Sequence, residues 1–287
     1  MKAKSAQLRS VSIVLAALCL NFALSPAERA QAQTGDSPSP TAANKAGRPA
    51  IIAHRGGKRW APENSLSAFK KALAAGVDGI ELDIHKCKSG ELVVIHDDTL
   101  NRTTNGSGYV KDRTWEELAK LDSGSWYSPA FKGERLPLLK EVLDLVQGKI
   151  LINIEIKNCP INYAGIDDDL LKMLESYPYP DKIIISSFDH SVLKRIHAKN
   201  KKYKLALLGD SVMADLGAYA RGVGAAAWNP DFDCVREDTV KDAHKASLAV
   251  NTWTVNGPDN WKRATNLQVD SIITDDPEGL KTFLENN

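Results

Sequence analysis

Carboxylate side chains at alternating positions in an apolar segment are the first feature of this sequence that could do chemistry. In residues 79–85, which read GIELDIH, Glu81 and Asp83 lie two residues apart. Side chains of a β-strand alternate between two faces, so these carboxylates would share one face and the intervening apolar side chains the other. Adjacent carboxylates repel each other unless a cation lies between them, and Mg²⁺ and Ca²⁺ prefer such oxygen ligands. The alternative is a half-exposed strand whose carboxylates face water.

Recurrence of this pattern favours the metal site. Residues 153–157, which read NIEIK, place Glu155 and Lys157 on one face of a second apolar segment. Two further apolar segments, residues 51–53 and 93–95, are each followed directly by a histidine. Four such segments are hard to explain as solvated faces. The polar side chains that they carry are His54, Arg55, Glu81, Asp83, His96, Glu155 and Lys157.

This set of residues suits a reaction at an anionic phosphorus centre. Three carboxylates could hold one Mg²⁺ or Ca²⁺ and leave positions for water or substrate oxygens. With Arg55 and Lys157 included, the loaded site would carry roughly one positive charge, which favours a phosphodiester substrate. Two histidines on opposite sides of phosphorus could act as general base and general acid near neutral pH. A single histidine is more often structural, but a pair beside a carboxylate cluster favours catalysis.

Alternating strands and helices must position these residues. The first helix is expected over residues 65–75, with Asn64 as its N-cap and Gly76 at its end. The last helix is expected to begin with Asp276 as N-cap and Pro277 as its first residue. This alternation predicts an α/β fold, a TIM (β/α)₈ barrel in which the ends of all parallel strands meet at one rim. The expected strands cover residues 51–53, 79–85, 93–95, 151–156, 183–186, 205–208, 225–228, 249–253 and 271–274.

Nine expected strands are one too many for an eight-stranded barrel. Only residues 86–91 separate the second from the third, too few for a parallel crossover, and residues 88–91 are typical of a hairpin turn. We therefore expect these two strands to be antiparallel. If the numbers of facing residues sum to about 179, Asp83 faces His96.

Residues 98–137 interrupt the alternation and form a small insertion after the third strand. The segment begins with ten turn-forming residues, and a short helix is expected over residues 115–121. Insertions between barrel strands usually lie over the active face, so we expect a cap whose wall includes Trp126, Tyr127 and Phe131. The alternatives are a surface excursion without function, or aromatic rings packed on the barrel helices.

The N-terminus has the features of an export signal. A positively charged start precedes a mainly apolar run of 14 residues at 11–24, and an Ala-x-Ala cleavage site follows at residues 30–32. The apolar run is too short for a stable membrane span, and Cys19 lies inside it, which disfavours a lipid anchor. We expect a signal peptide over residues 1–32, a flexible leader over 33–48 and a barrel over 49–287, so the product would be periplasmic or secreted without a stable membrane anchor.

The net charge limits the possible binding partners, and the cysteine content limits the possible disulfides and zinc sites. The net charge is +1, and removal of residues 1–32 leaves 33 basic against 35 acidic side chains, or −2. This balance provides no basic surface for nucleic acid. Of the four cysteines, Cys87, Cys159 and Cys234 would remain, which excludes a disulfide framework, and none has the spacing of a zinc site. Burial as small apolar residues is expected for all three.

The sequence also resembles the glycerophosphodiester phosphodiesterase family over about residues 50–283. The resemblance implies a TIM barrel with an insertion after His96, one divalent metal, and hydrolysis of glycerophosphodiesters to sn-glycerol 3-phosphate and an alcohol. The motifs that carry it are His54-Arg55-Gly56, Pro62-Glu63-Asn64, Gly79-Ile80-Glu81-Leu82-Asp83, Val94-Ile95-His96-Asp97, Ile154-Glu155-Ile156-Lys157, Trp253-Thr254-Val255-Asn256 and Ile273-Thr274-Asp275.

The resemblance also implies roles for individual residues. His54 and His96 match the acid/base pair, and Trp253 matches a residue that lines the substrate pocket, although filling of the barrel core is an alternative for this Trp. The metal ligands correspond to Glu81, Asp83 and Glu155, and the phosphate contacts to Arg55 and Lys157.

Two other functions remain open at this stage. The related sphingomyelinase D and phosphoinositide-specific phospholipase C groups share the design of two histidines and an acidic metal site. A phosphodiesterase or lyase of that type is therefore one alternative. A non-catalytic periplasmic binder of phosphorylated solutes is the other, although it would have little reason to keep both histidines and three carboxylates. The choline, ethanolamine, glycerol and inositol diesters are all candidate substrates.

Overall fold

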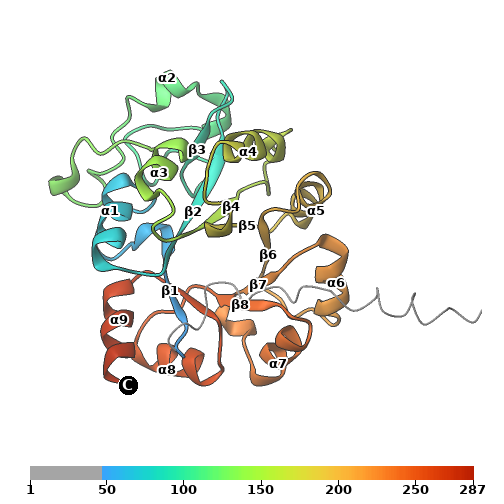
Figure 1. The fold of residues 1–287 in the computed structure, drawn as a ribbon. Coiled ribbons are helices and arrows are strands. Elements are labelled where there is room, and N and C mark those ends of the chain that lie inside the picture. Colours follow the sequence, from blue (N-terminus) through green and yellow to red (C-terminus); the bar gives the residue numbers. More distant parts are fainter. Residues whose placement is uncertain (1–46) are drawn as a thin grey trace, which may run out of the picture. The chain divides into compact units, whose positions relative to one another are not determined.

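Eight parallel strands form a closed ring in the computed structural model, which describes residues 47–287 (Figure 1). The predicted signal peptide and residues 33–46 of the predicted leader lie outside the described residues. The ring closes because β1 pairs with β2 on one side and with β9 on the other. The predicted TIM barrel is therefore confirmed. Its strands are β1 (Ala50–Ala53), β2 (Gly79–Lys86), β4 (Leu151–Ile156), β5 (Ile183–Ser187), β6 (Lys204–Gly209), β7 (Ala227–Pro230), β8 (Ala249–Thr252) and β9 (Ser271–Thr274).

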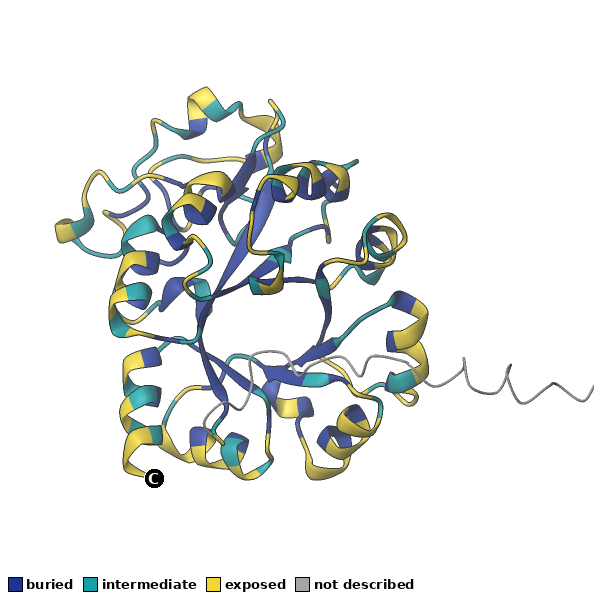
Figure 2. Ribbon diagram, in the orientation of Figure 1, coloured by how far each residue is buried: buried dark blue, intermediate teal, exposed yellow. Residues whose placement is uncertain are grey.

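Helices surround the ring on its outside, with exposed residues turned away from the strands (Figure 2). Apolar side chains of the strands, such as Leu82 and Ile154, pack outward against helix residues such as Phe69 and Leu170, all completely buried. The longer helices are α1 (Leu66–Ala75), α3 (Leu139–Val146), α4 (Ile166–Glu175), α5 (His190–Lys199), α6 (Leu216–Val223), α7 (Glu237–Lys245), α8 (Pro258–Asn266) and α9 (Pro277–Asn286). Short turns of 3₁₀ helix lie at η1 (His54–Gly56), η2 (Val110–Asp112), η3 (Pro129–Phe131), η4 (Pro180–Lys182) and η5 (Phe232–Cys234).

The surplus strand is β3 (Leu92–Val94), which pairs antiparallel with β2, as predicted. The register differs from the expected one. Ile84 pairs with Val94, so facing residue numbers sum to 178, and Asp83 accepts a backbone hydrogen bond of 3.1 Å from Ile95. Asp83 therefore lies opposite Ile95 and not, as predicted, opposite His96, because the hairpin is closed one residue tighter. Gly90 makes this possible with a φ of +103° in the turn.

The ends of the first and last helices follow their capping chemistry with one correction. Gly76 ends α1 in the left-handed region, and Asp276 caps α9 ahead of Pro277, as predicted. The N-cap of α1 is Ser65, whose hydroxyl accepts from the Ala68 N–H, and not Asn64. Asn64 has a φ of +57° and turns its side chain toward the barrel interior, where it meets a carboxylate.

The insertion forms a small unit with its own core, shown in green in Figure 1 beside β3 and α3. Its single α-helical turn is α2 (Trp115–Leu118), which is capped by Thr114. This helix is shorter than the predicted 115–121. The buried residues of this core come from the insertion, from β3 and from the β2–β3 hairpin, and they are Cys87, Val93, Ile95, Leu100, Val110, Leu118 and Leu136.

The aromatic residues of the insertion lie against the first helix of the barrel and the loop before it. Tyr127 donates a 2.8 Å hydrogen bond to the carbonyl oxygen of Arg59, and the ammonium of Lys71 in α1 lies 5.6 Å from the ring centre of Phe131. Trp126 and Tyr127 contact edge to face with ring centres 5.8 Å apart. These contacts tie the insertion to the segment that follows β1.

Two further observations bear on predictions made above. Cys87 and Cys234 are buried as predicted, whereas Cys159 is exposed, because it lies in the loop after β4 beyond the end of the strand; all three are free thiols. Within residues 47–287, none of the helices combines the length and the apolar character needed to span a bilayer.

Candidate active site

Three buried carboxylates meet inside the barrel at the ends of β2 and β4. One oxygen from each of Glu81, Asp83 and Glu155 lies within 4.8 Å of the others. The parallel pairing of the two strands explains this, because Asp83 lies directly opposite Glu155 and Glu81 lies two residues earlier on the same face. The cluster predicted from the alternating pattern is therefore present in the fold.

Two cationic side chains border this cluster. The ammonium of Lys157 lies 2.8 Å from Oε1 of Glu155 and 3.6 Å from Oδ1 of Asp83. Arg55 donates its backbone N–H to Oε2 of Glu81 at 2.8 Å, and its Nε lies 3.5 Å from Oδ2 of Asp83. This arrangement depends on the left-handed backbone of Arg55, whose φ is +50° directly after β1.

The charge balance of the cluster is incomplete without a further cation. Burial and the neighbouring charge of Asp83 raise the pKa of Glu81 well above its usual value, and the same two causes raise the pKa of Glu155 to about 7. Only Asp83 keeps a lowered pKa, because Lys157 and Arg55 outweigh the effect of its burial. Carboxylates that resist ionisation for lack of positive charge are a fitting ligand set for Mg²⁺ or Ca²⁺.

His54 lies at the end of β1 and is held by a carboxylate from the other end of the chain. Its Nδ1 is 2.6 Å from Oδ1 of Asp275, and its Nε2 is 4.0 Å from Oε2 of Glu81. Burial lowers the pKa of His54, which keeps the ring neutral at pH 7. The pKa of Asp275 is lowered to about 2, because the hydrogen bond from His54 outweighs its burial. Since an ionised Asp275 can only accept, Nδ1 carries the ring proton and Nε2 is free to accept one.

His96 has the same arrangement on the other side of the cluster. Its Nδ1 is 2.7 Å from Oδ1 of Asp97, and its Nε2 is 3.2 Å from the ammonium of Lys157. Burial lowers the pKa of His96 as well. Both histidines therefore turn Nδ1 to an aspartate and Nε2 to the border of the carboxylate cluster.

The sequence of residues 54–279 matches the Glycerophosphoryl diester phosphodiesterase family. The chain belongs to this family. A glycerophosphodiester phosphodiesterase of Caldanaerobacter subterraneus subsp. tengcongensis is 41% identical over 231 residues, which cover 80% of this chain and 95% of that protein. Another, from Bacillus altitudinis, is 38% identical over 232 residues, which cover 79% and 95%. The crystal structure of a glycerophosphodiester phosphodiesterase from Agrobacterium tumefaciens str. C58 has a TM-score of 0.72 at 26% identity and covers 82% of this chain and 99% of that chain.

The site also contains residues to which no role in the site was assigned from the sequence. Asp97 and Asp275 both lie in motifs that carry the family resemblance, but Asp275 is 221 residues from His54, and no local pattern indicated that these two side chains meet. Asn64 donates to Oδ2 of Asp83 at 2.8 Å and so fixes the orientation of that carboxylate.

A third histidine, His85, contacts the backbone of His96. The buried His85 contacts the carbonyl oxygen of His96 through Nε2 at 3.0 Å and the hydroxyl of Tyr163 through Nδ1 at 2.8 Å. It shares the inward face of β2 with Glu81 and Asp83, and this position was the one available sequence signal.

Trp253 of this phosphodiesterase lies at the mouth of the barrel and packs partly on its lumen. Its indole rests on the buried apolar cluster that includes Ile52 and Leu151, and its Nε1–H donates to the carbonyl oxygen of Asn229 at 2.9 Å. Its ring meets Phe188 edge to face with centres 5.7 Å apart, and the Phe188 side chain is exposed. The two expectations for Trp253, pocket lining and core filling, are both compatible with this half-buried position.

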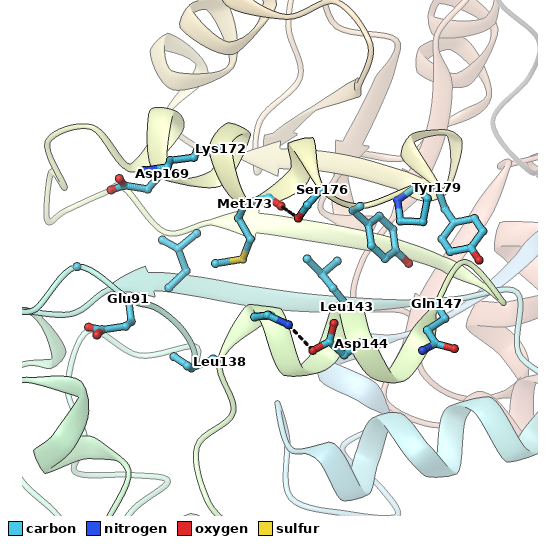
Figure 3. A pocket seen from close by; sticks show the side chains of 15 residues that line it. Glu91, Leu138, Leu143, Asp144, Gln147, Asp169, Lys172, Met173, Ser176 and Tyr179 are labelled. Carbon is cyan, nitrogen blue, oxygen red and sulfur yellow. Dashed lines mark hydrogen bonds and ion pairs between the residues drawn. The ribbon is translucent and has the colours of Figure 1, made fainter.

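A cavity of about 810 Å³ lies on the outside of the barrel, between α3 and α4 (Figure 3). Leu143, Met173 and Tyr179 contribute apolar surface to it, and Lys140 pairs with Asp144 at its edge. None of the predicted site residues lines this cavity. Volume alone therefore does not locate the chemistry of the enzyme, because the catalytic candidates all face the barrel interior.

Proposed function

We propose that this enzyme hydrolyses glycerophosphodiesters to sn-glycerol 3-phosphate and an alcohol, with His54 and His96 as general acid and base and with one Mg²⁺ or Ca²⁺ as cofactor. The observation that carries the proposal is the matched geometry of the two histidines. Each is neutral, each has Nδ1 held by an aspartate, and each has Nε2 beside the same carboxylate cluster. Two proton-transfer groups on either side of one charged centre are what in-line displacement at phosphorus requires.

Glu81, Asp83 and Glu155 would hold the cation, which when bound polarises a phosphoryl oxygen as a Lewis acid. Arg55 and Lys157 lie beside these carboxylates and supply positive charge for the remaining phosphoryl oxygens. Burial would lower the pKa of Lys157, but Asp83 and Glu155 outweigh it and raise the value to about 12, so the ammonium stays charged. Arg55 and Lys157 therefore bind and orient an anionic diester at neutral pH.

The proton transfers take place at the Nε2 atoms. In the first step one neutral histidine accepts, at Nε2, the proton of the glycerol hydroxyl that attacks phosphorus. The other histidine, which has first taken up a proton from solvent at Nε2, donates that proton to the leaving alcohol oxygen. The product of this step is a cyclic phosphate. In the second step the two histidines exchange roles, and water opens the ring to give sn-glycerol 3-phosphate. An enzyme that stops at the cyclic phosphate would be a lyase of the sphingomyelinase D type, and phosphorus NMR of the reaction distinguishes the two outcomes.

Release of glycerol 3-phosphate from purified protein tests the proposed activity. We expect release from at least one diester in a panel of choline, ethanolamine, glycerol and inositol head groups, and loss of activity after chelation that Mg²⁺ or Ca²⁺ restores. Absence of activity with every diester in the presence of either cation would refute the enzymatic proposal and favour a solute binder. Activity that persists in protein shown by elemental analysis to be metal-free would refute the cation requirement.

The variants His54→Ala and His96→Ala test the acid/base roles. We expect each to lower kcat on the order of 10²- to 10⁴-fold with an unchanged circular dichroism spectrum. Turnover near that of the wild type in either variant would remove that histidine from the mechanism.

We also propose that the enzyme is exported and acts in the periplasm or outside the cell. The support is the positively charged start, the mainly apolar run of 14 residues and the Ala-x-Ala site at the N-terminus. Fractionation of producing cells, with the N-terminus of the product determined by mass spectrometry, tests this. A product that begins near residue 33 in the exported fraction agrees with the proposal, and an intact Met1 in the cytoplasmic fraction contradicts it.

A further inference from the structure

We propose that Arg102, from the insertion, is a positioning residue that fixes the catalytic orientation of His96 through Asp97. This inference rests on the proposed function of His96. It gives the insertion, which lies outside the barrel, a role in catalysis, and it assigns that role to the side chain of Arg102.

Arg102 makes four hydrogen bonds to two carboxylates that belong to the site. Its Nε and one terminal nitrogen donate to the two oxygens of Asp97 at 2.8 and 2.9 Å. Its two terminal nitrogens donate to the two oxygens of Glu63 at 2.9 and 2.7 Å. The guanidinium thus bridges both carboxylates in the bidentate geometry that best defines orientation. A lysine in its place could not reproduce this double fork.

The carboxylate of Glu63, which binds Arg102, is itself buried and hydrogen-bonded. Its side chain is only 3% exposed, and it also accepts a 2.7 Å hydrogen bond from Arg55, which follows His54 at the end of β1. The hydrogen bonds from Arg102 and the charge of Arg55 outweigh burial and lower the pKa of Glu63, so this carboxylate is ionised at neutral pH. Arg102 is therefore anchored to the loop between β1 and α1 through a buried carboxylate.

Asp97 transmits the restraint to His96. Its Oδ1 accepts from Arg102 and also contacts Nδ1 of His96 at 2.7 Å. Without Arg102, the side chain of Asp97, which is 27% exposed, could rotate into water and release the ring. The chain of contacts from the buried Glu63 to Arg102, Asp97 and His96 is the physical reason for the assignment.

The test compares Arg102→Ala and Arg102→Lys with the matched control Arg113→Ala. Arg113 is also an exposed arginine of the insertion, but its side-chain partners are Glu117 and the carbonyl oxygen of Ser107. We expect Arg102→Ala to lower kcat about 10- to 100-fold with little change in KM, Arg102→Lys to recover only part of this loss, and Arg113→Ala to retain wild-type kinetics. Equal kcat values for Arg102→Ala and Arg113→Ala would overturn the proposal.

A double-mutant cycle with Asp97→Ala separates positioning from mere attachment of the insertion. If Arg102 acts through Asp97, the loss of kcat in the double variant equals that in Asp97→Ala alone, whereas multiplied losses would overturn the assignment.

A readout without substrate distinguishes failure of this inference from failure of the proposed function. The Nδ1 proton resonance of His96, assigned by its absence in His96→Gln, should be lost or shifted in Arg102→Ala and unchanged in Arg113→Ala. An unshifted resonance in Arg102→Ala refutes the proposal even if no diester is hydrolysed.

Discussion

At the scale of single residues, the site is built from two similar units on opposite sides of a carboxylate cluster. In each unit an ionised aspartate holds Nδ1 of a neutral histidine, at 2.6 Å for Asp275 with His54 and at 2.7 Å for Asp97 with His96. This hydrogen bond selects the tautomer whose Nε2 accepts a proton. We therefore expect both aspartates to contribute to catalysis, although neither borders the carboxylate cluster directly.

The first residue-scale prediction concerns Asp275. In Asp275→Asn the amide can donate to Nδ1 and stabilise the wrong tautomer of His54, so we expect kcat to fall on the order of 10²-fold. Asp276→Asn is the matched control, because Asn also caps the N-terminus of α9 well. Steady-state kinetics of both variants measure the difference. If Asp275→Asn is as active as the control, the hydrogen bond does not orient the base.

A second residue-scale prediction concerns the pH dependence of cation binding. Burial and the charge of Asp83 raise the pKa of Glu155 to about 7, so protons occupy this carboxylate in the cation-free enzyme below that pH. A cation must displace the proton, and its affinity should weaken roughly tenfold for each pH unit below 7. Calorimetry with Ca²⁺ or Mg²⁺ in buffers of different ionisation enthalpy measures the released proton. A Kd that is constant between pH 5.5 and 7.5 would contradict this.

At the scale of elements, β2 has the largest share in the site. Its inward face carries Glu81, Asp83 and His85, and its extension beyond the barrel pairs with β3 to deliver the segment of His96. The insertion starts directly after this segment and returns to contact α1 and the loop before it. A substrate that enters from the rim would therefore meet the insertion beside His96.

The element-scale prediction separates the two proposed tasks of the insertion, positioning of His96 and restriction of substrate size. Replacement of residues 99–134 by a short Gly/Ser linker removes Arg102 and should lower kcat for all diesters, while cation binding persists because no carboxylate ligand is altered. If the insertion also caps the site, the replacement should raise kcat/KM for bulky lipid diesters relative to small ones, and Arg102→Ala should leave this ratio unchanged.

The measurement is a kinetic comparison of both variants with a small water-soluble diester and a lipid diester. An equal ratio of kcat/KM values in the replacement variant and in the wild type would show that the insertion does not restrict access. The positioning role of Arg102 would remain unaffected by that result, since it predicts the same loss for both substrates.

At the scale of the whole molecule, the barrel buries three carboxylates in its lumen, where burial disfavours their ionised form. Three carboxylates lie in the lumen at the junction of β2 and β4, and the apolar lumen clusters below them come from most of the remaining strands. The closed ring holds the three carboxylates close together although they repel each other. A cation that binds only the folded enzyme should therefore stabilise the entire domain.

Thermal unfolding tests this whole-molecule prediction. At a cation concentration about 100 times its Kd, stabilisation amounts to about 2.7 kcal/mol, which raises Tm by several degrees for a domain of this size. The variant Glu155→Gln should lose most of this response because it lacks one ligand. Melting curves with and without Mg²⁺ or Ca²⁺, and with Na⁺ at equal ionic strength as control, measure it. An equal response of wild type and variant would exclude Glu155 as a ligand.

The sequence by itself determined the architecture and most of the charged residues of the site. The strand pattern is local, because alternating faces and apolar runs depend on neighbours along the chain, and β4 and β9 have the predicted bounds. Once the strands are parallel, the barrel carries their carboxyl ends to one rim, so Glu81, Asp83 and Glu155 had to meet.

Only the tertiary structure decided how these residues are held. The contact of His54 with Asp275 joins the ends of β1 and β9, the first and last strands, and the contact of Arg102 with Glu63 joins the insertion to a loop. Asn64 shows the same limit, because a residue suited to capping a helix instead binds Asp83 when the left-handed backbone turns it inward. Side-chain partners far apart in sequence depend on the register and on loop conformation, which no local pattern encodes, and a shift of one residue in the β2–β3 hairpin changes what faces Asp83.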